Sequence, residues 1–224
     1  MAKRENSVPI ARMYGGFSSD ERRAHRRSRL IEAGFHLFGT VGYPGVSIPE
    51  ICSRAGVTAR HFYDGFDSRE ALLKQIYDDI SAVLYFRVRN AIFGEEKGAA
   101  NVVRAGCAAY AEYLTSDPRR ARIFSIEIAG ISRELDQHRL ATRRRFAQLS
   151  LESTQRLREV AFDPGIDFAV VSTLLTGAAD ALMGEWVLTR EPSVPALIDT
   201  LTTVWMRSLQ VDRLAEMLAK RATS

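Results

Sequence analysis

Residues 47–69 read SIPEICSRAGVTARHFYDGFDSR, and this stretch decides the fold. It contains two helix-start signals close together. Ser47 and Glu50 have the spacing of a capping box, in which each side chain accepts a backbone N–H of the other residue. Thr58 is of a type that favours capping a second helix, and Gly56 lies between the two signals, where a helix commonly ends. Two short helices joined by a tight turn predict a helix-turn-helix.

The segment before this stretch is basic. Residues 1–17 mix basic residues with proline and glycine and show no periodicity, which predicts a disordered basic tail. Residues 18–21 repeat the capping-box spacing and predict the start of a helix that Gly39 and Gly42 end. Five arginines lie in its first turns, within residues 22–29. They suit either a solvated helix face or an arm that follows DNA phosphates, and the sequence leaves both open.

The remainder of the chain shows only helical periodicity. Ser68 is predicted to cap a long helix from Arg69 towards Phe93. Further helices are predicted at 98–115, 118–130, 133–161, 166–189 and 194–210, with an extension to 220 left open. No strand-like alternation with tight turns occurs, and no window approaches the ~20 uninterrupted apolar residues that cross a bilayer. The sequence therefore predicts an all-α protein without a membrane-spanning segment.

Charge is unevenly distributed along the chain, whose formal net charge is +4. Residues 1–75 contain 12 Lys and Arg against 8 Asp and Glu, whereas residues 76–224 contain 19 of each. The whole excess therefore lies in the first third, which favours a polyanionic partner for that part alone. Two cysteines and the lack of a signal-peptide pattern favour a reducing compartment, so we expect a cytoplasmic protein.

Fixed spacings across residues 30–73 form a longer pattern. It reads LIxAGxxLFxxxGY from residue 30, VSIxxI from 46, RAGVT from 54 and FYxxFxSREALL from 62. The pattern resembles the DNA-binding domain of the tetracycline-repressor (TetR) family of bacterial transcriptional regulators. The resemblance implies about nine helices, with a three-helix DNA-binding domain at 18–75 and a larger helical domain at 76–224 for ligand binding and dimerisation.

The resemblance also implies a function. It indicates a homodimeric repressor that binds a palindromic operator in double-stranded DNA and is released by a small-molecule effector, with no cofactor. An activator of the same family is one alternative, and a helical small-molecule-binding protein with a degenerate DNA-binding domain is another. Gly65 stands where the family commonly has histidine, and Pro49 stands where some members have a basic residue, which keeps the last alternative open.

The DNA contacts that the resemblance implies can be assigned residue by residue. Hydroxyls at two helix starts would meet phosphates, three residues of the recognition helix would approach base edges, and two residues beyond them would hold phosphates. These are Ser47 and Thr58, then Ala59, Arg60 and His61, then Tyr63 and Arg69. Arg60 carries most of the expected specificity, because arginine pairs bidentately with O6 and N7 of guanine. A local capping or packing role for His61 is the alternative.

The helix predicted at 166–189 is apolar over most of its circumference, so we expect it to be buried on several sides. With the helix that follows, it would form a four-helix bundle with a second copy of the chain across a two-fold axis. The residues predicted for this dimer interface are Leu175, Ala178, Ala181, Leu182, Leu197, Leu201 and Trp205. An apolar core helix inside a monomer is the alternative.

Aromatic and polar residues on the middle helices are the candidates for a ligand pocket, because pockets are mostly apolar with a few placed polar groups. They are Tyr110, Tyr113, Phe124, Glu127, Phe146 and Trp186. Glu127 lies in an apolar run and could instead pair with an arginine such as Arg122 or Arg143.

Catalytic and metal-binding patterns are missing from the sequence. The four histidines, at 25, 36, 61 and 138, are scattered, and neither a metal-ligand spacing nor a nucleophile elbow occurs. We therefore expect no metal site and no enzymatic activity.

Overall fold

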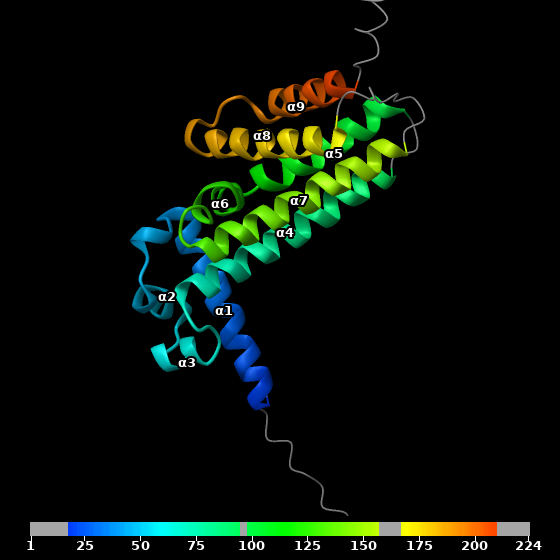
Figure 1. The fold of residues 1–224 in the computed structure, drawn as a ribbon. Helices are drawn as coiled ribbons and strands as arrows, with labels where there is room; N and C mark the ends of the chain where they lie inside the picture. Colours follow the sequence, from blue (N-terminus) through cyan, green and yellow to red (C-terminus); the bar gives the residue numbers. More distant parts are fainter. Residues whose placement is uncertain (1–17, 95–97, 157–166, 210–224) are drawn as a thin grey trace, which may run out of the picture.

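A computed structural model describes residues 18–94, 98–156 and 167–209, and these residues form nine α-helices without a strand (Figure 1). The helices are α1 (Ser19–Thr40), α2 (Ile48–Ala55), α3 (Ala59–Tyr63), α4 (Arg69–Gly94), α5 (Ala99–Thr115), α6 (Pro118–Arg122), α7 (Arg133–Gln155), α8 (Phe168–Thr189) and α9 (Val194–Leu209). A 3₁₀ turn, η1 (Tyr43–Gly45), and a π-helical turn, η2 (Ile123–Glu127), complete the order. The all-α prediction is confirmed. The predicted tail at 1–17, the predicted helical residues 157–161 and the extension beyond 209 lie outside the described residues.

Capping hydrogen bonds confirm the predicted helix starts. Ser47 Oγ accepts the Glu50 N–H at 3.4 Å while Glu50 Oε2 accepts the Ser47 N–H at 2.7 Å, which completes the capping box of α2. A second capping box, formed by Ser18 and Glu21, opens α1. Gly56 ends α2 with φ at 60°, a left-handed conformation that glycine adopts without steric cost.

The end of α1 differs from the prediction. Gly39 does not stop the helix, which continues to Thr40. A side chain at Gly39 would collide with Arg119, so this glycine lets α6 approach α1 closely. The stop comes from Gly42 alone, whose φ of 100° is rare for residues with a side chain.

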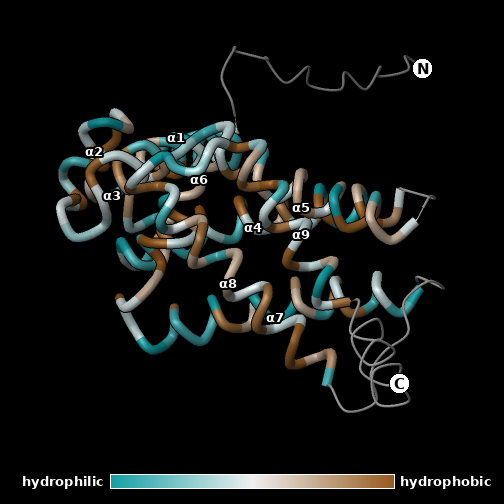
Figure 2. The backbone as a smooth tube through the Cα atoms, turned by 90° about the horizontal axis from the view of Figure 1, so that it is seen from above, coloured by the Kyte–Doolittle hydropathy of each residue, from teal (hydrophilic) through white to brown (hydrophobic). Residues whose placement is uncertain are grey.

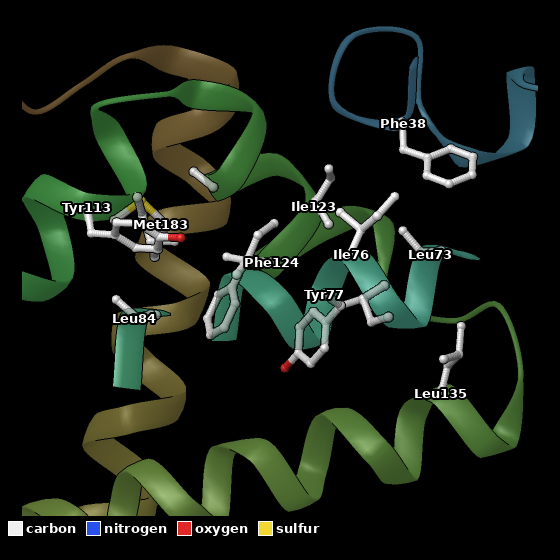
Figure 3. Packing of buried hydrophobic residues seen from close by; sticks show 14 of the residues in the cluster. Phe38, Leu73, Ile76, Tyr77, Leu84, Tyr113, Ile123, Phe124, Leu135 and Met183 are labelled. Atoms are coloured by element: carbon white, nitrogen blue, oxygen red, sulfur yellow. The ribbon is translucent and has the colours of Figure 1, made fainter. Parts of the chain in front are cut away.

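The helix predicted at 118–130 is also different. Asp117 caps α6 as predicted, but α-helical geometry ends at Arg122 and gives way to the π-helical turn η2. A period of 3.6 residues in the apolar pattern does not anticipate a wider turn. Within η2 the side chain of Phe124 points into the core, where its ring stacks on Tyr77 of α4 with centroids 5.4 Å apart (Figure 3).

The helices form two parts that share α4. Helices α1, α2 and α3 lie together at one end, and α5, α7, α8 and α9 form an elongated body along the rest of α4 (Figure 1). Hydrophobic and hydrophilic residues are interspersed along the helices (Figure 2). One core cluster extends from Phe38 of α1 through Ile76 of α4 to Met183 of α8 (Figure 3). The predicted domain boundary between residues 75 and 76 falls inside α4.

Candidate DNA-binding surface and ligand cavity

Helix α3 buries one aromatic side chain in the core and exposes polar side chains to solvent. Phe62 is fully buried, whereas Ala59 and Arg60 are exposed. Tyr63 is 58% exposed, so its hydroxyl is open to a partner. The helix therefore offers one arginine and one tyrosine to a macromolecule that approaches this end of the protein.

The two helix-start hydroxyls predicted to meet phosphates are exposed, and each already bonds within the protein. The Ser47 hydroxyl donates to Glu50 Oε2 at 2.6 Å. Thr58 Oγ1 accepts the His61 N–H at 3.4 Å and lies 3.1 Å from His61 Nδ1, so the histidine also has a local partner. The free N–H groups at the start of a helix favour phosphate whatever the capping hydroxyl does.

Arg69 is half-buried and braces the turn before α2. Its Nη1 donates to the carbonyl oxygen of Tyr43 at 3.1 Å and to that of Val46. The guanidinium carbon lies 4.2 Å from the centre of the Tyr43 ring. A phosphate contact by Arg69 would use its remaining N–H groups.

The two departures from the family pattern fit the fold. A Cβ atom at Gly65 would meet no atom nearer than 3.6 Å, so the position accepts a larger side chain and does not require glycine. Pro49 stands in the first turn of α2, where the missing N–H costs no helical hydrogen bond. Neither residue distorts the helix-turn-helix.

The arginine-rich start of α1 is partly structural. Arg27 lies 4.6 Å over the ring of Phe66 and donates from Nη2 to Gln75 Oε1 at 2.7 Å. It thereby holds α1 against α4. Arg22, Arg23 and Arg29 are exposed and Arg26 is half-buried, so the choice between a solvated face and a DNA arm concerns these four.

A cavity of about 100 Å³ lies between α4, α5, α7, α8 and α9, and its walls are mostly apolar. Three of the six residues predicted to bind ligand line it and three lie elsewhere: Tyr110, Phe124 and Phe146 belong to the wall, and Tyr113, Glu127 and Trp186 do not. Leu201 and Trp205, predicted for the dimer interface, also line the cavity.

Buried charge marks one part of the cavity wall. Asp180 is 4% exposed, and its Oδ2 accepts hydrogen bonds from Arg139 Nη2 at 2.9 Å, from Arg143 Nε at 2.9 Å and from Arg143 Nη2. Within the described part of the chain, Asp180 Oδ1 and the buried Tyr110 hydroxyl have no hydrogen-bond partner. Burial raises the pKa of Tyr110 well above its ordinary value and that of Cys107 to about 11, so both groups stay protonated at neutral pH.

Glu127 lies between the two parts of the molecule. Its side chain is 6% exposed and accepts the Tyr43 N–H at 2.7 Å and the Nε–H of Arg122 at 2.7 Å. Arg122 also donates from Nη1 to the carbonyl oxygen of Thr40 at 2.7 Å and from Nη2 to that of Val41 at 3.3 Å. The pairing with Arg122 is therefore present, and these contacts form a clamp, the Arg122–Glu127 clamp, between η2 and the end of α1.

Helix α8 is only partly covered by its own chain. Leu175 is buried, but Val170 is 64%, Leu174 69% and Leu188 79% exposed. By length and composition alone α8 could cross a membrane, and 22% of its most apolar window is buried. A single helix of this kind is a weak indication of a membrane span. The exposed apolar side chains of α8 indicate a surface that binds another molecule.

The residues predicted for the dimer interface separate into three groups. Leu175, Leu197 and Leu201 are buried within the protomer, Leu182 and Trp205 are half-buried, and Ala178 and Ala181 are exposed. The exposed apolar surface of α8 therefore follows Val170, Leu174 and Ala181. The apolar pattern contains both stripes, and only packing distinguishes the stripe that faces the chain's own core.

Known proteins share the motif and the architecture. Residues 30–76 match the family described as "Bacterial regulatory proteins, tetR family". The fatty acid degradation regulator FadR from Bacillus halodurans is similar in structure, with a TM-score of 0.70 at 16% identity over 83% of this chain and 96% of that one. The regulator FadR from Bacillus subtilis, solved in complex with stearoyl-CoA, has a TM-score of 0.66 at 19% identity over 79% and 96%. A TetR-like transcriptional regulator from Rhodococcus sp. RHA1 has a TM-score of 0.65 at 15% identity over 82% and 95%. No curated protein sequence matches the chain.

Proposed function

We propose that the chain is a TetR-family repressor that leaves its operator DNA when a small apolar molecule enters its cavity. The observation that carries the proposal is the double contact of η2. Phe124 of this turn lines the cavity, and Glu127 of the same turn holds the backbone of Tyr43 in the DNA-binding part. A cavity and a DNA-binding part that share one turn can influence each other.

We infer that α3 enters the major groove of DNA. A helix with its side chains is ~10–12 Å across, which matches the ≈12 Å width of that groove. Exposed Arg60 would read base edges, and exposed Tyr63 would hold a phosphate. The helix starts at Ser47 and Thr58 would add backbone N–H contacts to phosphates.

A second copy of the chain would cover the exposed stripe of α8. Val170, Leu174 and Leu188 lie on an apolar helix that one protomer leaves open, which supports a four-helix bundle of α8 and α9 from two subunits. Such a dimer presents two α3 helices to two half-sites about 34–36 Å apart, as a palindromic operator requires. It also accounts for the apolar surface without a membrane, in line with a cytoplasmic regulator.

The effector would act by shifting a population of conformers. Ligand packed against Phe124 would favour a conformer in which η2, and with it the Arg122–Glu127 clamp, holds the end of α1 differently. Each α3 would then no longer match its half-site. Because the coupling is reciprocal, operator DNA must weaken effector binding by the same factor.

The cavity also indicates what kind of molecule would act. Its walls are mostly apolar, and the relative from Bacillus subtilis was solved with stearoyl-CoA, which carries a long apolar chain. Both support an effector with an apolar chain. Among the described residues no group of three or more His, Cys, Asp and Glu is placed to hold a metal ion.

Selection of DNA sequences by the full-length protein tests the proposal. Bound fragments from a random pool should enrich a palindrome whose half-sites lie about one helical turn apart. A transcription assay on a promoter overlapping that palindrome should then show repression. Enrichment of no palindrome contradicts the DNA-binding role, and increased transcription contradicts repression in favour of activation.

A further inference from the structure

The polar part of the cavity wall identifies the chemistry of the ligand. Asp180 and Tyr110 belong to the wall, and Asp180 is almost completely buried. In the described residues nothing in the protein donates to Asp180 Oδ1 or bonds the Tyr110 hydroxyl. Buried polar atoms are almost always hydrogen-bonded, so a carboxylate oxygen and a hydroxyl left unpaired beside a cavity favour a molecule with matching groups.

The charges around these atoms disfavour an ionised head group. Asp180 is held by two arginines, Arg139 and Arg143, so the cluster carries a net positive charge that repels an ammonium group. A carboxylate has no proton to donate to Asp180 Oδ1, so its negative charge would face that oxygen without a hydrogen bond between them. Arg143 already directs two of its N–H groups to Asp180 Oδ2. A neutral group that both donates and accepts meets neither penalty.

Three other hydroxyl groups of the wall are already bonded. Ser153 and Thr154 each donate to the carbonyl oxygen of Ser150, at 2.8 and 2.9 Å, and Thr176 donates to that of Ser172 at 2.7 Å. They therefore have no proton left to offer a ligand. Among the fully buried side-chain nitrogen and oxygen atoms of the described wall residues, Asp180 Oδ1 and the Tyr110 hydroxyl are the ones without a hydrogen-bond partner, which favours a ligand whose polar group meets both.

The shape of the cavity favours a slender molecule. On α7 the lining residues extend from Arg143 to Thr154, a stretch of about 16 Å at 1.5 Å per residue. The cavity has a volume of about 100 Å³, which is small for lining residues spread over such a length of helix. It suits an unbranched chain better than a bulky ring system.

We propose that the cavity binds a straight-chain molecule with a neutral hydroxyl, such as a primary alcohol, whose O–H donates to Asp180 Oδ1 and whose oxygen accepts the Tyr110 O–H. The burial that keeps Tyr110 protonated preserves this donor at neutral and mildly alkaline pH. The inference rests on the proposed function only in treating the cavity as the effector site.

Matched eight-carbon probes test the head group in the full-length dimer. We would follow tryptophan fluorescence, because Trp205 lines the cavity, during titration with 1-octanol, octanoate, octylamine and octanoyl-CoA at pH 7.5. We expect 1-octanol to bind about tenfold more tightly than each of the other three, because they either carry a charge at the head or lack the O–H donor. Equal or tighter binding of any one of them, or no binding of 1-octanol, overturns the proposal.

Substitution of the two wall residues tests the contacts. Tyr110→Phe should weaken 1-octanol binding about three- to tenfold, the loss of one buried hydrogen bond. Tyr85→Phe is the matched control, since Tyr85 packs edge-on against Phe146 but its side chain is not in the wall. Asp180→Asn should weaken binding further, and Tyr110→Phe keeps the test valid if that variant does not fold. Unchanged 1-octanol affinity in Tyr110→Phe refutes the contact.

DNA binding is measured separately, so the two proposals can fail independently. A protein that selects a palindrome but ignores 1-octanol would retain the regulatory role and lose the ligand class. A protein that binds 1-octanol through Tyr110 and selects no DNA would retain the ligand class and lose the regulatory role.

Discussion

Two arginines of the helix-turn-helix show how one residue type takes different tasks. Arg69 is half-buried, and its Nη1 donates hydrogen bonds to the carbonyl oxygens of Tyr43 and Val46, so it fixes the turn before α2. Arg60 is exposed on α3 and is free to approach a base pair. The resemblance implies DNA contacts for both residues, and their surroundings differ: Arg69 braces a turn, whereas Arg60 is exposed to solvent.

Arg60→Ala is expected to change specificity more than fold. The side chain is exposed, so its removal leaves the core intact, while a bidentate pair with guanine contributes about 1–3 kcal/mol of discrimination. The sequence selected by the variant should lose its preference at one base pair in each half-site. Selection from random DNA, compared with the unchanged protein, measures this, and an identical selected motif would rule out base reading by Arg60.

Tyr63→Phe is the companion variant for a phosphate contact. Tyr63 is 58% exposed and would meet the backbone of DNA, which is the same at every sequence. We expect a roughly uniform loss of affinity and an unchanged selected motif. A motif that changes in Tyr63→Phe would place this residue at a base edge.

For the helices, the sequence predicts the first residues more reliably than it predicts which neighbouring elements each helix face packs against. The capping boxes of Ser18 and Ser47 are local, so short spacings are enough to place α1 and α2. The two apolar stripes of α8 look alike in sequence, yet Leu175 packs inside the protomer and Leu174 is 69% exposed. Which stripe meets the chain's own core depends on how α8 packs against α7, α6 and η2, and the pattern within α8 does not contain that information.

The π-helical turn η2 is the element that the sequence predicts least well. Its apolar residues continue the pattern of α6, so one helix is the natural expectation, and Glu127 looks like a ligand contact. The structure instead directs Glu127 to the N–H of Tyr43, 84 residues away in the chain. A backbone donor has no sequence signature, which is why this contact could not be foreseen.

Glu127→Gln tests the Arg122–Glu127 clamp. The amide keeps the size of the side chain but removes the charge that holds Arg122, and Arg122 is 31% exposed, so water compensates for part of the loss. We expect a loss of about 1–2 kcal/mol in the free energy of unfolding, or roughly 2–8 °C in Tm, measured by thermal unfolding. Glu112→Gln, an exposed glutamate on α5, is the control. Equal Tm values for the two variants would show that the clamp contributes no stability.

At the scale of the whole molecule, the two parts form one mechanical unit. The core runs without interruption from Phe38 of α1 to Met183 of α8, and α4 belongs to both parts. A change at the cavity can therefore reach α3 through α4 and through η2, without a flexible linker that would absorb it. The basic excess of the first 75 residues and the neutral remainder agree with this division of tasks between DNA and ligand.

Dimerisation is the whole-molecule property on which operator binding depends, and Leu174→Glu tests it. Leu174 is 69% exposed in the protomer, so a charge there leaves the subunit fold intact. The dimer would bury residue 174 of both subunits. Each buried leucine would stabilise the dimer by about 1.5–3 kcal/mol, whereas each glutamate would be a buried charge without a partner. Light scattering should therefore give a mass near 25.0 kDa for the variant and twice that for the unchanged protein.

Operator affinity should fall by about 10²-fold or more, because one α3 engages only one half-site at a time. Phe86→Glu changes an exposed apolar residue on α4, outside α8 and α9, and should keep both the dimer mass and the affinity. A Leu174→Glu protein that remains dimeric would place the interface elsewhere and leave the apolar stripe of α8 to another partner.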